Sequence, residues 1–316
     1  MPRLQLLSHT HINKSQWDAC VHSSPQFVVY ALSWYLDVVS PDWEGIVLAE
    51  NGQYQAVMPV PVRQKLGISY VHQPLFCQQL GIFGNGNPLD FLTMLQKHYR
   101  FCARYHLNST DTASLNKQPL YNTSTELLQT HILDLSPDYQ AIYSRYNADR
   151  KMNLKRAKQA QWKCQEGTDI KPLITLFKEN HANQITGGVA KGAYDLLENL
   201  YQVIQNQGTS QLWYALKNGQ IEAGCWFVFS GSRVIYLFNA ASPIGRKGNA
   251  RTWLLDRFFQ EYAGNKLVFD FESPTIEPID AFYESFGAIA QPFYRLRYNH
   301  FAWWMKALQR LWQRRH

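Results

Sequence analysis

Two short segments of the chain resemble each other, and this internal repeat constrains the fold more than any other feature. Residues 49–56 read AENGQYQA and residues 216–223 read LKNGQIEA, and each segment lies between apolar runs. Asn-Gly between apolar runs is a strong signal for a tight β-hairpin, because both residues readily adopt positive φ. The sequence therefore predicts two equivalent hairpins, one in each half of the chain.

The segments that follow the two hairpins also match in order. An apolar segment, a loop with Gly and Asn, and an amphipathic helix follow within residues 81–105 in the first half and residues 236–263 in the second. Matching elements in matching order indicate an internal duplication. We expect an α/β fold with mixed sheets, made of two tandem domains at 1–135 and 136–300 and followed by a basic amphipathic helix at 301–316.

Composition and motifs limit the classes of function. Apolar residues make up 46% of the 316 residues, and no apolar run approaches the ~18 residues of a membrane-spanning helix. The N-terminal residues lack the apolar stretch of a secretory signal. The five scattered cysteines form no Cys-x-x-Cys pair, so we expect reduced thiols and a cytoplasmic protein. Metal-ligand spacing, a Gly-x-Ser-x-Gly elbow and a Walker loop are absent from the sequence, so we expect no metal and no serine-hydrolase or nucleotide-hydrolase chemistry.

Positive charge is concentrated in the second half of the chain. The net charge is +7, and residues 141–316 hold 23 Lys and Arg against 14 Asp and Glu. Residues 150–163, RKMNLKRAKQAQWK, carry six cations and no acid. We take Arg150, Lys155 and Arg156 from this segment as candidates for binding an anion. A solvated basic face without a ligand is the alternative.

The basic segment is expected on a helix that enters the second domain. Residues 136–138, Ser-Pro-Asp, have the pattern of a helix start, with Ser as the cap, Pro at the first helical position and an acid in the first turn. We therefore predict one long helix with the cations on its C-terminal part. The apolar residues that would share one face of it at helical spacing are Ile142, Tyr146, Leu154 and Ala157.

Taken in order, these features resemble the tandem GNAT-type acyltransferases, a group that includes the Fem peptidyltransferases and related acetyltransferase-like proteins. Residues 150–157, RKMNLKRA, match the arginine-rich helix that opens the family's second domain. Residues 270–273, DFES, and residues 281–288, AFYESFGA, match its acidic strand end and its short helix ending in Phe-Gly. The resemblance runs through most of the chain. It implies two GNAT domains, with the active cleft in the second, and transfer of an acyl group from a thioester such as acyl-CoA to a primary amine.

The GNAT superfamily binds the phosphates of its donor with a loop of the pattern Arg/Gln-x-x-Gly-x-Gly/Ala. Residues 245–250, GRKGNA, fit this frame at the second glycine and the alanine but begin with Gly245. A helix N-terminus offers N–H groups and partial positive charge to a phosphate, and glycine permits its close approach. An ordinary surface loop is the alternative, and the first half's GNGNP at residues 84–88 is expected to be a degenerate copy. The resemblance implies donor-binding roles for Arg246, Lys247, Gly248, Asn249, Ala250 and Arg251.

The same resemblance implies that strands at 234–240 and 266–270 splay apart around the donor's thioester arm. Aminolysis then requires a base for the amine, hydrogen-bond donors for the oxyanion and a proton for the leaving group. Asp270 and Glu272 lie two apart on an expected strand, so both face one side and either can serve as the base. Tyr283 resembles the tyrosine that protonates the leaving thiolate in many GNAT domains, Asn239 can donate to the oxyanion, and His181 can line the acceptor pocket. Ion pairs with nearby arginines and core packing are the structural alternatives.

The last residues, 301–316, add a second basic feature. Their aromatic and aliphatic side chains form one stripe of a helix and their cations line the other side, so this helix can either contact a membrane surface or dock onto the first domain. Three functions stay open. The chain is a thioester-dependent N-acyltransferase, a Fem-type transferase that takes its acyl group from aminoacyl-tRNA for a cell-wall precursor, or a catalytically decayed adaptor. We rank the first highest, because the long helical hairpin of some Fem proteins is missing; the second would use the cations on tRNA phosphates.

Overall fold

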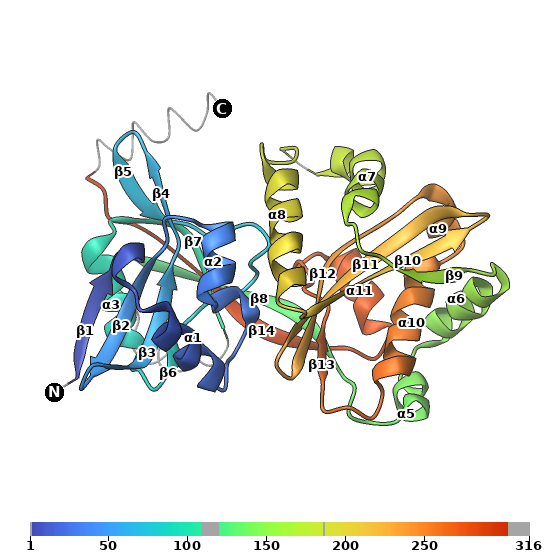
Figure 1. Cartoon of the computed structure of the whole chain (residues 1–316), viewed down its shortest axis with the longest axis horizontal. Helices are drawn as coiled ribbons and strands as arrows, with labels where there is room; N and C mark the ends of the chain where they lie inside the picture. Colours follow the sequence, from blue (N-terminus) through green and yellow to red (C-terminus); the bar gives the residue numbers. More distant parts are fainter. Residues whose placement is uncertain (1, 109–119, 186, 303–316) are drawn as a thin grey trace. The chain divides into compact units, whose positions relative to one another are not determined.

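The structure is a computed structural model that describes residues 2–108, 120–185 and 187–302. The chain forms two compact units, Met1–Leu128 with Pro292–His316 and Gln129–Gln291 (Figure 1). Strands β8 (Thr123–Asp134) and β14 (Ile289–Asn299) each pass from one unit into the other. The expected division at 135 and 300 therefore differs from these units, because most of the last strand of the second half is counted with the first unit.

The first unit contains two sets of paired strands. One set, in the order β1-β2-β3-β6, consists of β1 (Arg3–Leu7), β2 (Glu44–Glu50), β3 (Gln53–Val60) and β6 (Phe83–Gly84). The other set, in the order β4-β5-β7-β14, adds β4 (Val62–Lys65), β5 (Ile68–Val71) and β7 (Phe101–Leu107). Its described helices are η1 (His9–His11), α1 (Lys14–Ser23), η2 (Val29–Ala31), α2 (Ser33–Val39) and α3 (Pro88–His98).

The second unit is built on strands in the order β8-β13-β12-β11-β10-β9. These are, besides β8, strands β9 (Lys163–Glu166), β10 (Ser210–Lys217), β11 (Gln220–Ser230), β12 (Arg233–Ala241) and β13 (Val268–Asp270). The helices are α5 (Tyr139–Ser144), α6 (Ala148–Gln159), α7 (Lys171–Asn180), η4 (Ala182–Gln184), α8 (Ala193–Asn206), α9 (Pro243–Lys247), α10 (Ala250–Tyr262) and α11 (Glu277–Glu284).

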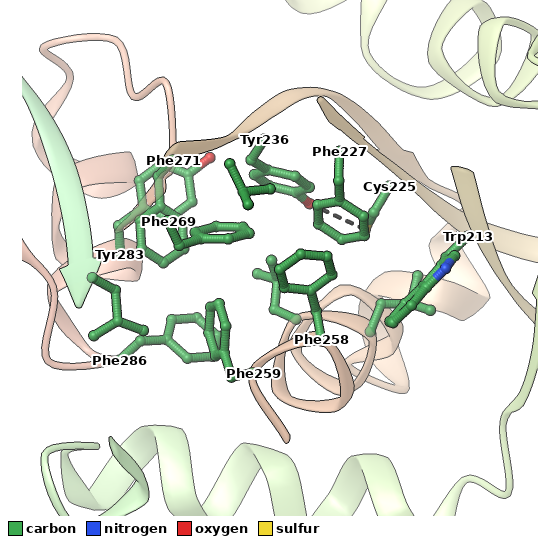
Figure 2. Close-up of a cluster of buried hydrophobic side chains, with 14 of the residues drawn as sticks. Trp213, Cys225, Phe227, Tyr236, Phe258, Phe259, Phe269, Phe271, Tyr283 and Phe286 are labelled. Atoms are coloured by element: carbon green, nitrogen blue, oxygen red, sulfur yellow. Dashed lines mark hydrogen bonds between the residues drawn. The ribbon is translucent and has the colours of Figure 1, made fainter. Parts of the chain in front are cut away.

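Both faces of this second sheet are covered by helices. Successive side chains of β11 point to opposite faces, and Trp226 contacts Tyr201 of α8 whereas Phe227 contacts Phe258 of α10. The α10 side holds an aromatic core (Figure 2), in which the ring centroids of Phe227 and Phe258 lie 4.2 Å apart and Phe269 packs against both. Apolar burial of this kind is the main stabilising contribution to a domain fold, and here it fixes α10 beneath the strands that carry the candidate site.

Both predicted hairpins are present. The Asn-Gly pairs at 51–52 and 218–219 join β2 to β3 and β10 to β11, and both have φ values of 51 and 78. In the first half, β4 and β5 are inserted after the hairpin and are followed by β6, α3 and β7. In the second half, β12, α10 and β13 follow the hairpin, with α9 inserted. The order of the elements thus agrees with the duplication inferred from the sequence.

The segment after residue 136 forms two helices, so the prediction of one long helix is wrong. Asp138, and not Ser136, caps α5 by accepting from the N–H of Ala141. Asn147 has an extended backbone and starts α6 afresh by accepting from the N–H of Arg150. A side chain that bonds the backbone locally competes with helix continuation. The predicted apolar face is confirmed, since the buried residues include Ile142, Tyr146, Leu154 and Ala157.

Candidate active site

All of strand β13 pairs with the first residues of β12, and the pairing stops where β13 ends. Their parallel register runs from Arg233 opposite Val268 to Ile235 opposite Asp270. β13 ends there, whereas β12 continues to Ala241. The last part of β12 therefore carries backbone N–H and C=O groups that β13 does not pair. This is the arrangement that the resemblance implied for the two strands.

A bulge bends β12 where it leaves its neighbour. β11 and β12 pair Trp226 with Phe238 and Phe227 with Tyr236, so Leu237 is an extra residue on β12. A bulge increases local twist and changes the direction of a strand. The bend lies just beyond the last residue that β13 pairs, which gives a local cause for the separation.

The predicted donor-binding loop is largely helical. Ser242 caps α9 by accepting from the N–H of Gly245 at 3.0 Å, and Asn249, with φ 55, separates α9 from α10. The N–H groups of Arg246, Gly248 and Asn249 donate to carbonyls of the same segment. An anion would therefore find its N–H groups in the first turn of α10, where a helix leaves them without an internal partner. That turn begins at Ala250.

Two glycines of this loop are required by packing. A Cβ on Gly245 would lie 2.1 Å from the carbonyl oxygen of Glu222, and one on Gly248 would lie 2.4 Å from the ring of Trp162. The indole N–H of Trp162 also donates to the carbonyl of Gly248 at 2.9 Å. No side chain fits at residue 245, which explains why the chain departs there from the Arg or Gln of the superfamily pattern. Lys247, by contrast, is exposed.

Basic side chains converge on the part of β12 that β13 does not pair. Arg251 donates to Oδ1 of Asn239 at 2.7 Å, and Arg246 donates to the carbonyl of Ala241 at 3.0 Å. The Nε2 atom of His181 accepts the N–H of Ala241 at 3.3 Å. Burial and the charges of the two arginines lower the pKa of His181, so its imidazole is neutral at neutral pH. The end of β12 is therefore a polar cluster with two fixed positive charges.

Asp270 is a buried carboxylate, only 3% exposed, that organises the end of β13. It accepts from the guanidinium of Arg233 at 2.6 Å and from the hydroxyl of Thr130 at 2.7 Å. The N–H of Glu272 donates to the same carboxylate at 2.9 Å. Three donors thus hold Asp270 in the interior, and one of them is the backbone N–H of Glu272.

Glu272 lies beyond the strand and has an unusual backbone. β13 ends at Asp270, so the strand alternation that placed both carboxylates on one face does not reach Glu272, and that part of the prediction is wrong. The φ of Glu272 is 48. Positive φ is uncommon for residues other than Gly, Asn and Asp, and such outliers concentrate at functional sites. Glu272 is half-buried, directly after the point where β12 and β13 separate.

Tyr283 of α11 is buried next to this position. Its ring packs on Phe271 with centroids 4.4 Å apart, and Figure 2 shows the two rings side by side. Burial raises the pKa of Tyr283 to about 12, and the charges of Arg251 and Glu272 both act on it. Within the described parts of the chain, no hydrogen bond is formed by its hydroxyl. The hydroxyl of Tyr283 is therefore neutral at neutral pH.

Arg150 is not a surface cation. It is 5% exposed, donates to the hydroxyls of Ser285 at 2.8 Å and Thr252 at 2.6 Å, and stacks on Phe282 at 4.2 Å. Burial lowers the pKa of Arg150 to about 10, so it stays charged at neutral pH. Through Thr252 it supports the first turn of α10 from inside. This burial contradicts its selection as an anion-binding residue of the surface.

The other two basic candidates are on the surface. Lys155 and Arg156 are exposed on α6, together with Lys158. The predicted anion-binding group is thus divided by the helix, with Arg150 on the buried side. Sequence reasoning missed Arg233 and Thr130, which fix Asp270. Nothing in the sequence connects them to Asp270, which lies 37 and 140 residues further along the chain.

Two further predictions concern membranes and metals. None of the helices described in residues 2–302 is long and apolar enough to cross a membrane. Among the described residues, no group of His, Cys, Asp and Glu side chains could hold a metal ion. The predicted helix at 301–316 lies outside the described residues except for its first two positions.

Solved structures share the fold of this chain over nearly its whole length. The structure of FemX is similar with a TM-score of 0.64 and 12% identity, and covers 92% of this chain and 96% of its own. A tandem GNAT protein from the clavulanic acid biosynthesis pathway has a TM-score of 0.57 and 10% identity, with coverages of 93% and 98%. The chain has a tandem GNAT-like fold.

A third similar structure is that of L-PGS from Bacillus licheniformis, with a TM-score of 0.55 and 11% identity, covering 92% of this chain and 93% of its own. Neither a protein-family model nor a curated protein sequence matches the chain. The likeness is thus one of fold, and it confirms the predicted α/β class and the two GNAT-like domains.

Proposed function

We propose that this tandem GNAT-like chain is an N-acyltransferase whose second unit moves an acyl group from an activated ester, foremost a thioester such as acyl-CoA, to a primary amine. The observation that carries the proposal is the separation of β12 from β13. Asn239 lies on the part of β12 that β13 does not pair, and Glu272 and Tyr283 lie next to the end of β13. The fold shared with FemX and with the tandem GNAT protein supports it.

Glu272 is the proposed base. An alkylamine has a pKa of about 10, so it must lose a proton before it attacks. The carboxylate of Glu272 takes this proton, directly or through one water. Asp270 acts as a positioning residue, because its buried carboxylate accepts the N–H of Glu272 and is itself fixed by Arg233. The strained backbone of Glu272 is thereby held in one orientation.

Asn239 and Tyr283 are proposed to serve the two later steps. Attack on the ester carbon produces an oxyanion, which a fixed amide N–H stabilises. The Oδ1 atom of Asn239 is occupied by Arg251, which orients its amide nitrogen as the donor. Collapse of the intermediate releases a thiolate, and the hydroxyl of Tyr283, kept protonated by its raised pKa, supplies the proton.

The donor's phosphates are proposed to bind at the start of α10. The loop N–H groups at 246, 248 and 249 are already bonded, so binding relies on the first turn of α10 and on the cations Arg246, Lys247 and Arg251. The pantetheine arm would follow the backbone of β12 that β13 does not pair. Acyl-CoA is a substrate in this scheme, and the residues supply hydrogen bonds and charge.

Aminoacyl-tRNA is the second candidate donor, with a cell-wall precursor as acceptor, and the surface of α6 favours it. Lys155, Arg156 and Lys158 are exposed on this helix, in a segment without acids. Contacts between cations and RNA phosphates weaken steeply as salt is added. Salt dependence therefore separates this donor from a thioester.

The test is transfer to a panel of primary amines, followed by mass spectrometry, with acyl-CoA and with charged tRNA as alternative donors. Glu272→Gln and Tyr283→Phe are each expected to lower the rate by about 100-fold or more, the usual contribution of general acid–base groups. Glu277→Gln, on the exposed start of α11, is the matched control and should retain activity.

The donors are distinguished in the same assay. If tRNA is the donor, the rate falls steeply with added salt and with the double change of Lys155 and Arg156 to Gln. Transfer from acyl-CoA depends less steeply on salt, because fewer phosphates are bound, and is unaffected by the double change. Absence of both transfer and a thermal shift with every donor would contradict the proposal and leave the decayed adaptor as the better description.

A further inference from the structure

The hairpin between β4 and β5 has a leucine where its backbone disfavours one. Leu66 and Gly67 form the turn, with φ values of 50 and 74. The turns at 51–52 and 218–219 have the same geometry, with φ values of 51 and 78, and both use Asn-Gly. Asn tolerates positive φ, whereas leucine is strained there. A leucine in a backbone conformation that disfavours it points to a role outside the turn.

The side chain of Leu66 makes almost no use of the protein interior. It is 85% exposed, more than any other large apolar side chain of the described residues. The hairpin projects from the first unit (Figure 1). Beside the tip, exposed Lys65 lies opposite half-buried Ile68. The end of the hairpin therefore presents an exposed apolar side chain, Leu66, with the cation Lys65 next to it.

Four arginines gather on the strands behind this tip. Arg63 lies on β4, Arg104 on β7, and Arg295 and Arg297 on β14. Their charges act on one another, because burial and the fields of the other three lower the pKa of Arg104. Arg295 pairs with Glu126 at 2.8 Å, but within the described ranges no carboxylate forms an ion pair with the other three.

Two histidines next to these arginines add no charge at neutral pH. Burial, with Arg63 and Arg104 nearby, lowers the pKa of His72 to about 4. Burial also lowers the pKa of His106 to about 4, and the Nε atom of Arg295 lies 3.4 Å from its Nε2. The positive charge of this surface therefore comes from the guanidinium groups, which bind phosphate through paired N–H donors.

We propose that Leu66 and the four arginines form one docking surface for an anionic phospholipid membrane, with Leu66 entering the acyl boundary and the guanidinium groups on the headgroup phosphates. Leu66 lies three positions after Arg63, which corresponds to about 10 Å of extended chain. An interfacial element enters a bilayer by a similar ~5–10 Å. An exposed leucine gains from this environment and gains nothing from the phosphates of RNA, which favours the lipid surface. The inference does not depend on acyl transfer.

The test is sedimentation of the full chain with vesicles of phosphatidylcholine, alone and mixed with phosphatidylglycerol. We expect binding to the mixed vesicles, and a loss of roughly tenfold in the partition coefficient for Leu66→Asn, because one large apolar contact is removed. Asn suits the turn, so the melting temperature of this variant should equal or exceed that of the parent. Leu127→Asn removes another exposed leucine of the same unit and is the matched control.

Each outcome decides for or against the surface. The double change of Arg63 and Arg104 to Gln should lower vesicle binding while Leu127→Asn leaves it unchanged. Equal binding of Leu66→Asn and the parent overturns the proposal, and so does an equal loss in Leu127→Asn. If the arginine changes lower binding of a single-stranded RNA and Leu66→Asn has no effect on vesicles, the surface recognises nucleic acid and the membrane assignment is wrong.

Discussion

Arg150 shows at the scale of one residue how a cation can belong to the interior. In the sequence it stands among six cations and looks like part of a solvated face. Helical spacing contained the opposite signal, because Arg150, Leu154 and Ala157 are separated by four and three positions and so share one face. All three are buried. Composition alone therefore misplaced a residue that periodicity would have placed correctly.

Arg150→Met is expected to destabilise the protein by about 2–4 kcal/mol, because two hydroxyls lose a charged donor and the stacking on Phe282 is lost. The measurement is the free energy of unfolding in urea. Arg156→Met, on the exposed side of α6, is the control and should change stability by no more than about 0.5 kcal/mol. Equal effects of the two changes would contradict the interior role.

Gly245→Ala is expected to destabilise the second unit by about 1–3 kcal/mol, since the new Cβ would overlap the backbone of Glu222 at 2.1 Å. Thermal unfolding followed by circular dichroism measures the effect. Lys247→Ala changes an exposed position of the same short helix and should leave the melting temperature near that of the parent. A neutral Gly245→Ala would show that the close packing against Glu222 is not required.

The residue types of the candidate site could be chosen from the sequence, but their geometry could not. Asp270 and Glu272 were selected as acids at a strand end, and the strand was expected to orient both alike. Hydrogen bonds from Thr130 and Arg233 hold Asp270 where β13 ends, and the N–H of Glu272 turns back to the same carboxylate. Such distant contacts leave no periodic pattern, so sequence reasoning could not reach them.

At the scale of elements, local signals were reliable where local chemistry decides the structure. The Asn-Gly turns specify hairpins because both residues tolerate positive φ, and both hairpins are present. The helix after residue 136 was predicted from an apolar face, which two helices satisfy as well as one. The two helices are divided at Asn147, a helix cap that was not recognised in the sequence. Periodicity gives the face of a helix more securely than its ends.

The hydrogen bonds between α10 and the α5 region lead to a prediction about how stability depends on pH. Asp256 of α10 is buried and accepts from Tyr139 at 2.8 Å, Tyr146 at 3.0 Å and Gln260 at 2.6 Å. Burial raises its pKa above 3.8 despite these donors. The native state therefore holds this proton more tightly than the unfolded state, so the contribution of Asp256 to stability is full below pH ~4 and falls as pH rises through the native pKa.

Asp256→Asn removes this titration while keeping a side-chain oxygen for the tyrosines. The variant should gain stability relative to the parent between pH 4 and pH 7, measured by urea unfolding at both values. Other carboxylates titrate alike in the two proteins, so the difference isolates Asp256. A difference between variant and parent that is the same at both pH values would show that the carboxylate keeps its ordinary pKa.

At the scale of the whole molecule, acid sensitivity is expected to begin in the first unit. Burial lowers the pKa of His72 and of His106 to about 4, against about 6.5 in an unfolded chain. Neutral histidine is favoured in the native state, so this stability is complete above pH ~6.5 and is lost as pH falls toward 4. The loss reaches about 3 kcal/mol for each histidine at pH 4.

His106→Gln should remove close to half of this acid-dependent loss, measured as the unfolding free energy at pH 7 and pH 4.5. His98→Gln replaces an exposed histidine of the same unit and should leave the pH dependence unchanged. If both variants follow the parent, the acid sensitivity arises elsewhere.

The exchange of strands between the halves makes the last strand necessary for the first unit. β14 pairs with β7 from Tyr294 opposite Leu107 to Asn299 opposite Phe101. A chain ending at residue 288 is expected to lose protection of β7 from hydrogen exchange, whereas a chain ending at residue 302 keeps β14 and should retain it. Normal protection of β7 in the shorter chain would contradict this role.

This exchange of strands also determines when the first unit can finish folding during synthesis of the chain. The ribosome synthesises the whole first half long before it reaches residue 299. The strands β1-β2-β3-β6 can pair at that stage, whereas β7 lacks one of its neighbours until β14 has been made. The strand pairing of the first unit is thus completed only after the second half has been synthesised. If the gene were split between the codons for residues 134 and 139, the N-terminal fragment would lack β14. It would then complete its strand pairing only when the C-terminal fragment is made in the same cell.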